Sequence, residues 1–163
     1  LANKDQLMRR YENMEFSSKL SRMTDKIKSG VPDISLPDIS GDTVALSSLN
    51  DKMILLSFWS ATNDQSVERN LKLKKLYKKY HNKGFEIYQV SLDKDKERWK
   101  TGVRFDELPW VSVHASNGPN AYAARLYNVK SLPADYLIKN GQTLVGKNPG
   151  ISELRRQLST TLE

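Results

Sequence analysis

The most informative segment of the sequence is Met53-Ile54-Leu55-Leu56-Ser57-Phe58-Trp59, in which Ser57 is the only polar residue. A strand this apolar must be covered on both faces, as the central strands of α/β proteins are. A helical pattern follows over residues 64–80, where Leu73, Leu76, Tyr77 and Tyr80 recur at three- and four-residue spacing. Together the two segments predict a buried central strand that leads into a helix packed on its own sheet.

The segments on either side continue the alternation of strands and helices. Upstream, 33–39 and 43–46 flank Ser40-Gly41-Asp42 and predict a β-hairpin. Downstream, the pattern predicts strands at 85–92, 110–114, 136–139 and 143–145, and helices at 95–103, 121–127 and 151–162. The last two strands are joined by Asn140-Gly141, a strong hairpin turn signal. The pattern therefore predicts one α/β domain over residues 31–163, an ordinary size for a single core.

Residues 1–30 have a different pattern and are assigned to a separate helical arm. Ser29-Gly30-Val31-Pro32 ends this arm, because Gly favours the position after a helix and Pro cannot continue one. We expect the arm to pack on the domain or on a neighbouring chain, with a linker role as the alternative. We also expect sequence before Leu1, either a removed targeting segment or the rest of the gene. The amphipathic helix is predicted over 4–28 from two apolar sets: Leu7, Tyr11 and Met14, then Phe16, Leu20, Met23 and Ile27.

The composition excludes whole classes of chemistry. The 163 residues include no cysteine, so the chain cannot exchange disulfides, use a thiol nucleophile or build a thiolate metal site. At 38% hydrophobic and 28% charged residues it has the composition of a globular protein. No run approaches the roughly 20 apolar residues that a membrane-spanning helix needs.

The net charge of +7 is concentrated on one predicted helix. Residues 64–83 contain seven basic and two acidic side chains. A solvated helix face explains this pattern, because the lysines fall opposite the apolar residues. The alternative is a surface for phosphate or anionic lipid, which we call the Lys72–Lys83 surface. Nucleic acid is not favoured, since the tyrosines lie on the wrong face to stack with bases.

No other motif indicates enzyme chemistry, a metal or a cofactor. His81 ends the basic helix and His114 ends a strand, and neither has acidic or histidine neighbours at metal-ligand spacing. The chain contains no G-x-S-x-G motif and no glycine-rich phosphate loop. We therefore expect no metal and no cofactor, and find no catalytic residues.

Four segments of the chain occur in a distinctive order. They are Ile54–Ala61, Leu76–Tyr80 with Lys83–Ser91, Ala123–Val129 followed by Leu132-Pro133, and Tyr136–Gln142. In this order they resemble the TlpA/ResA-type thiol-disulfide oxidoreductases of the AhpC/TSA-like family. The resemblance covers residues 31–162 and implies a thioredoxin-like fold, in which helices flank a central mixed sheet with an N-terminal β-hairpin. Similar proteins act outside the cytoplasm with a membrane tether, which implies a cell-envelope or periplasmic location.

The chain departs from this family where the family does its chemistry. The family places W-C-x-x-C directly after a Phe-Trp-x-x segment, so that the first thiol lies at a helix N-terminus and has a lowered pKa. Here the segment reads Thr62-Asn63-Asp64-Gln65-Ser66, with Asn63 and Ser66 in the two cysteine positions. A Cys→Ser double substitution would not produce Asn63, so we infer that the loss is natural.

The same residues have a structural and a functional interpretation. Asn63 is a good helix N-cap and Asp64 suits a first helical turn, which explains both without a ligand. Trp59 is better explained by core packing than by binding. Leu132-Pro133 matches the family's cis-proline, whose neighbouring backbone can pair with an extended peptide, although the proline can also simply shape the core.

The resemblance leads to a hypothesis about function. The chain is predicted to be a redox-inactive relative that holds a polypeptide or protein partner in the former active-site groove. The main rival is an interaction domain that acts through the N-terminal helix, and the oligomeric state stays open. The residues assigned to the groove are Trp59, Thr62, Asn63, Asp64, Gln65, Ser66, Ser131, Leu132 and Pro133.

Overall fold

The computed structural model describes residues 31–163, which form a five-stranded sheet and a separate two-stranded one. The large sheet has the strand order β5-β4-β3-β6-β7, and β1 pairs with β2 in the small one. The strands are β1 (Ser35–Pro37), β2 (Thr43–Ala45), β3 (Met53–Trp59), β4 (Phe85–Ser91), β5 (Val111–His114), β6 (Ala134–Lys139) and β7 (Thr143–Lys147). The α-helices are α2 (Asp64–Tyr80), α3 (Lys96–Phe105), α4 (Tyr122–Leu126) and α5 (Ile151–Leu162).

The central strand β3 is paired with β4 along its whole length and with β6 from Met53 to Phe58. It runs parallel to β4, with Trp59 opposite Ser91, and antiparallel to β6, with Phe58 opposite Ala134. β5 continues the parallel part, and β7 continues the antiparallel part. The C-terminal ends of β3, β4 and β5 and the start of β6 therefore lie at the same end of the sheet.

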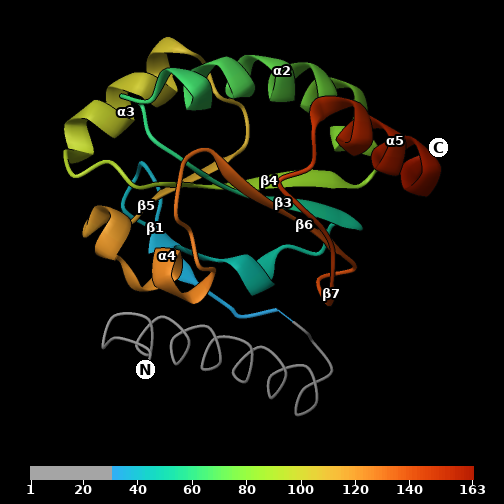
Figure 1. The fold of residues 1–163 in the computed structure, drawn as a ribbon, viewed down its shortest axis with the longest axis horizontal. Coiled ribbons are helices and arrows are strands. Elements are labelled where there is room, and N and C mark those ends of the chain that lie inside the picture. Colours follow the sequence, from blue (N-terminus) through green and yellow to red (C-terminus); the bar gives the residue numbers. More distant parts are fainter. Residues whose placement is uncertain (1–30) are drawn as a thin grey trace, which may run out of the picture.

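Helices cover both faces of the large sheet. Figure 1 shows α2, α3 and α5 over one face and α4 over the other. Side chains in β3 alternate between the two: Leu55 packs in the cluster under α2 and α5, and Phe58 packs in the cluster with α4. This alternation explains why nearly every residue of the strand is apolar, because both of its faces are buried.

The predicted fold class, an α/β thioredoxin-like fold around a central mixed sheet, is confirmed. Several bounds differ from the predictions, most clearly in the hairpin, whose strands are only three residues each. β1 ends at Pro37 because the Asp38 side chain accepts the backbone N–H groups of Ser40 and Asp42 and turns the chain. The predicted helix over 4–28, and with it the arm over 1–30, lies outside the described residues.

Neither a membrane span nor a metal cluster occurs between Val31 and Glu163. None of the helices in this range is long and apolar enough to cross a bilayer. No group of three or more His, Asp or Glu side chains in the same range is placed to hold a metal ion.

Candidate functional site

The loop between β3 and α2 contains the two positions at which the sequence resemblance implies thiols. Asn63 is the N-cap of α2, and its side-chain oxygen accepts the backbone N–H of Ser66 at 2.8 Å. Asp64 lies in the first turn, where a carboxylate complements the helix dipole. The capping interpretation of Asn63 is thus confirmed.

A buried carboxylate, Asp93, holds this loop from below. It is 5% exposed and lies just after β4. Its two oxygens accept the Ser60 hydroxyl at 2.7 Å, the Ala61 backbone N–H at 3.0 and 3.1 Å, and the Ser91 hydroxyl at 2.7 Å. All of these donors are neutral, and together they fix the position of Ser60 and Ala61 on the sheet edge.

Packing against α3 confines the same loop from the side. Gly102 of α3 lies so close that a Cβ at this position would come within 2.9 Å of the Ala61 Cβ. Behind the loop, His114 Nε2 lies 2.6 Å from the Asp93 backbone oxygen, and its ring stacks on Trp99 at 4.9 Å. The loop is therefore held by hydrogen bonds below and by close packing beside it.

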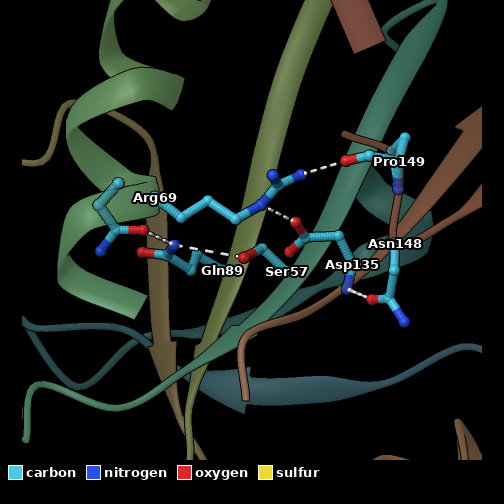
Figure 2. A network of polar contacts seen from close by, with 7 residues as sticks. Ser57, Arg69, Gln89, Asp135, Asn148 and Pro149 are labelled. Carbon is cyan, nitrogen blue, oxygen red and sulfur yellow. Dashed lines mark hydrogen bonds and ion pairs between the residues drawn. The ribbon is translucent and has the colours of Figure 1, made fainter. Parts of the chain in front are cut away.

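A row of polar side chains crosses the sheet beneath the first half of α2. Asp135, Ser57, Gln89 and Ser112 are paired neighbours on β6, β3, β4 and β5. Gln89 donates to the Asn70 side chain of α2 at 2.7 Å and to the Ser57 hydroxyl at 3.3 Å (Figure 2). This part of the helix–sheet interface is polar, whereas the second half of α2 packs on apolar residues.

An ion pair closes the row at β6. Arg69 of α2 forms a hydrogen-bonded ion pair with Asp135, and its guanidinium also donates to the Pro149 carbonyl at 2.8 Å (Figure 2). The Asn148 side chain accepts the Asp135 backbone N–H at 2.8 Å. One side chain of α2 therefore joins the helix to the start of β6 and to the β7–α5 loop.

Asp135 is 1% exposed, and burial has the largest influence on the pKa of its carboxyl group. Burial raises the pKa of this carboxyl, and the Arg69 guanidinium and the Ser57 hydroxyl offset part of the shift. Its Oδ1 has no hydrogen-bond partner by geometry among residues 31–163. Asp135 thus depends on a single charged neighbour for most of its stabilisation as an anion.

The Ser131–Pro133 segment lies beside the end of β3. Phe58 pairs with Ala134, so Leu132 and Pro133 lie just beyond the last pair of the two strands. The Leu132–Pro133 peptide bond is cis. In the described part of the chain, the backbone N–H and C=O of Leu132 form no hydrogen bond. The backbone of Leu132 therefore lies outside the hydrogen-bonded ladder of the sheet.

The structure separates the nine residues assigned to the groove. Thr62, Asp64, Gln65 and Ser131 are exposed, and Asn63, Leu132 and Pro133 are partly exposed. Trp59 and Ser66 are both 0% exposed, which corrects their assignment to a binding surface. Trp59 lies inside the core under α2, and the Ser66 hydroxyl points back to the Ser60 backbone N–H at 3.4 Å.

Sequence reasoning missed Arg69, Asp93 and Asp135. A signal exists for Asp135, since Ser57, Gln89 and Asp135 are polar interruptions in largely apolar strands. Such interruptions indicate a polar partner across the interface. The partner itself, Arg69, lies within a basic helix and looks like any other surface cation in the sequence.

Part of the Lys72–Lys83 surface is already neutralised within the chain. Lys72 lies 3.9 Å from Glu68, and Lys79 and Lys83 lie 3.6 and 3.8 Å from the same Glu163 carboxylate oxygen. These exposed pairs are weak. They nevertheless show that the surface contacts acidic side chains of its own domain.

Comparisons with a family model and with individual proteins indicate the same family. Residues 27–146 match the model of the AhpC/TSA family. Thiol-disulfide oxidoreductase ResA from Oceanobacillus iheyensis is 32% identical over 135 residues, which cover 80% of this chain and 67% of that protein. ResA from Bacillus cereus is 26% identical over 132 residues, covering 81% and 74%.

Solved structures show the same fold. The thioredoxin domain of a thiol-disulfide oxidoreductase from Bacteroides vulgatus superposes with a TM-score of 0.75 at 26% identity, covering 81% of this chain and 94% of that one. A thioredoxin-like protein from the same species is 39% identical, with a TM-score of 0.71 and coverage of 81% and 86%. The chain therefore shares both sequence and fold with proteins named for thiol chemistry, although it contains no thiol.

Proposed function

The chain belongs to the AhpC/TSA family, as a homologue of ResA-type thiol-disulfide oxidoreductases without cysteine, and from this premise we propose that it is a redox-inactive polypeptide-binding protein. The groove runs between the exposed rim at 62–65 and the Ser131–Pro133 segment. Its occupant is an extended segment of a protein partner. By family resemblance, the protein works in the cell envelope, with any membrane tether outside residues 31–163.

Redox inactivity follows from the residues at the two thiol positions. Asn63 caps α2 and Ser66 is buried under the loop, and neither can form or break a disulfide. We expect no reduction of insulin by dithiothreitol above the uncatalysed rate with the natural chain. The variant Asn63→Cys/Ser66→Cys should gain this activity, because the first thiol would lie at the N-terminus of α2, where its pKa is lowered.

A natural chain that accelerates the reaction would contradict redox inactivity. The Cys-containing variant is the positive control, since it shows that the assay detects this scaffold when thiols are present. A single variant, Asn63→Cys, separates dithiol exchange from the general reactivity of one exposed thiol.

One observation supports the groove above the others: the unpaired backbone of Leu132 at the end of the sheet. An extended peptide can add to such an edge through main-chain hydrogen bonds, with side-chain contacts giving specificity. The neighbouring loop is fixed by Asp93 and Gly102, so little ordering would be needed on binding. The exposed Thr62, Asp64 and Gln65 would contact the peptide side chains.

The test is an amide NMR titration of the isotope-labelled chain with unfolded, cysteine-free peptides. We expect localised shifts at 62–65 and 131–132. A matched peptide with alternate backbone nitrogens methylated should bind many-fold more weakly, because it cannot donate its main-chain hydrogen bonds. Absence of shifts at both segments in a well-folded spectrum would overturn the groove, and equal binding of both peptides would overturn strand addition.

A further inference from the structure

A concave site lies at the opposite end of the sheet from the proposed groove. It is a cavity of about 500 Å³ near the start of β3 and the end of β6, within the volume range of roughly 300–1,000 Å³ typical of ligand sites. Ile54 and Ile138 contribute from these two strands. The remaining lining residues are Val31, Asp33, Leu46, Ser47, Leu49, Asn50, Asp51, Asn140, Gly141 and Gln142.

The chemistry of this cavity is apolar inside and acidic at its rim. Leu46, Ile54 and Ile138 belong to the buried core under it. Asp33 and Asp51 are the charged residues of the lining, which includes no lysine or arginine although the chain carries a net charge of +7. Asp33 is fixed, since its oxygens accept the Ser47 backbone N–H at 2.9 Å and hydroxyl at 2.7 Å. Such a site suits an apolar surface that carries positive charge.

The chain itself supplies a segment with this chemistry. Residues 16–30 contain four basic side chains and one acidic one, whereas residues 1–15 contain three of each. The excess positive charge of the arm is therefore in the half that adjoins the domain. Val31, the residue directly after that half, itself lines the cavity.

The spacing of apolar residues in this half also fits. Phe16, Leu20, Met23 and Ile27 recur at the period of a helix and predict one apolar stripe, with Lys19 and Lys26 beside it. Val31 follows Ile27 by four positions, a span of at most about 14 Å. Gly30 permits a sharp change of direction between them.

We propose that residues 16–27 dock as an amphipathic helix onto this cavity of the same chain, with Met23 and Ile27 over its apolar floor and Lys19 and Lys26 toward Asp33 and Asp51. Docking would cover the start of β3 and tie the arm to the domain. This proposal does not depend on the proposed function, because the groove lies at the other end of the sheet.

The absence of cysteine makes the test direct. A nitroxide placed on the variant Gln142→Cys, at the exposed rim of the cavity, should strongly broaden the amide signals of residues 16–27 in the full chain. The same label on Gln65→Cys, at the opposite end of the sheet, should leave these signals unchanged. Unbroadened signals with the label at 142 would overturn the proposal.

Two further measurements test whether a second copy of the chain occupies the cavity and whether the apolar stripe makes the contact. A mixture of isotope-labelled natural chain and unlabelled, nitroxide-bearing Q142C chain should show no broadening. Broadening in the mixture would instead identify the arm of a second copy as the occupant and overturn docking within one chain.

Met23→Gln should reduce the broadening several-fold, and the matched control Met8→Gln, in the charge-balanced half, should not. Equal effects of the two substitutions would also contradict the proposal.

Discussion

Two carboxylates are buried on either side of the loop that begins α2, and they are stabilised in different ways. Asp93 accepts hydrogen bonds from neutral donors on both oxygens. Asp135 depends on the Arg69 guanidinium, and by geometry its Oδ1 has no partner within residues 31–163. The loop at the former thiol positions is thus fixed by neutral hydrogen bonds, whereas the joint between α2 and β6 depends on charge.

This difference predicts different responses to substitution and pH. Removing one partner of a buried ion pair leaves an uncompensated charge, which is among the most destabilising changes in a core. Removing one acceptor from a set of neutral hydrogen bonds costs less and acts locally. Three sets of variants test the comparison.

The largest effect is expected for Arg69→Met. It leaves the buried Asp135 carboxylate without its cation and should lower the free energy of unfolding by about 3–5 kcal/mol at pH 7. Urea unfolding measures this change. The control is Lys72→Met on the exposed side of the same helix, where the pair with Glu68 is worth about 0.5 kcal/mol or less.

The penalty of Arg69→Met should also depend on pH. Burial raises the pKa of Asp135 in the folded chain, so proton binding favours the folded state and this contribution is lost as pH rises through the folded pKa. Without Arg69 the pKa of Asp135 rises further, and the penalty should be smaller at pH 5 than at pH 7. The double variant Arg69→Met/Asp135→Asn should lose this dependence. A loss of unfolding free energy that is the same at pH 5 and pH 7 would contradict the conclusion that an ion pair joins α2 to β6.

A smaller and more local effect is expected for Asp93→Asn. The amide keeps the shape of the side chain but has one acceptor oxygen, so one of the donors around it loses its partner, at a cost of about 1–3 kcal/mol. Hydrogen exchange should accelerate at Ala61 and Thr62 before other parts of the sheet. Asp95→Asn is the matched control, because Asn caps α3 as well as Asp does. Faster exchange throughout the sheet would show that Asp93 acts on the whole fold.

The smallest effect is expected for Gly102→Ala. The added Cβ would collide with the Ala61 Cβ, and overpacking costs typically about 1–3 kcal/mol, against which the better helix propensity of Ala returns up to about 1 kcal/mol. Ala61→Gly removes the opposing methyl group. The double variant Ala61→Gly/Gly102→Ala should therefore recover stability, and a thermal-unfolding double-mutant cycle measures the coupling. If the stability changes of the two single variants simply add up in the double variant, the contact between Ala61 and Gly102 does not hold the loop.

The sequence predicted the apolar architecture because apolar periodicity is a local property. β3 matches its predicted bounds, and α2 begins and ends where the pattern indicates. Asn63 was assigned as a cap from its position alone, since capping also depends only on neighbouring residues.

The polar interior could not be predicted in the same way, because its partners come from distant segments. Asp135 and Arg69 are 66 residues apart in sequence, and Ser60 and Asp93 are 33 apart. A buried aspartate and an exposed one cannot be told apart in the sequence, because the donors that stabilise the buried one come from distant segments. For the same reason Ser66 was assigned to a surface, although its place in the first turn of α2 buries it.

The division of α2 into a polar and an apolar half has a consequence for its behaviour in the cold. Near its start the helix is attached through Arg69 and Asn70, and near its end through Leu73, Leu76 and Tyr80. Hydrophobic stabilisation weakens on cooling. As the temperature falls, the end of α2 near Tyr80 therefore loses more of its attachment to the sheet than the end that carries the loop, so chilling would loosen the helix from its far end.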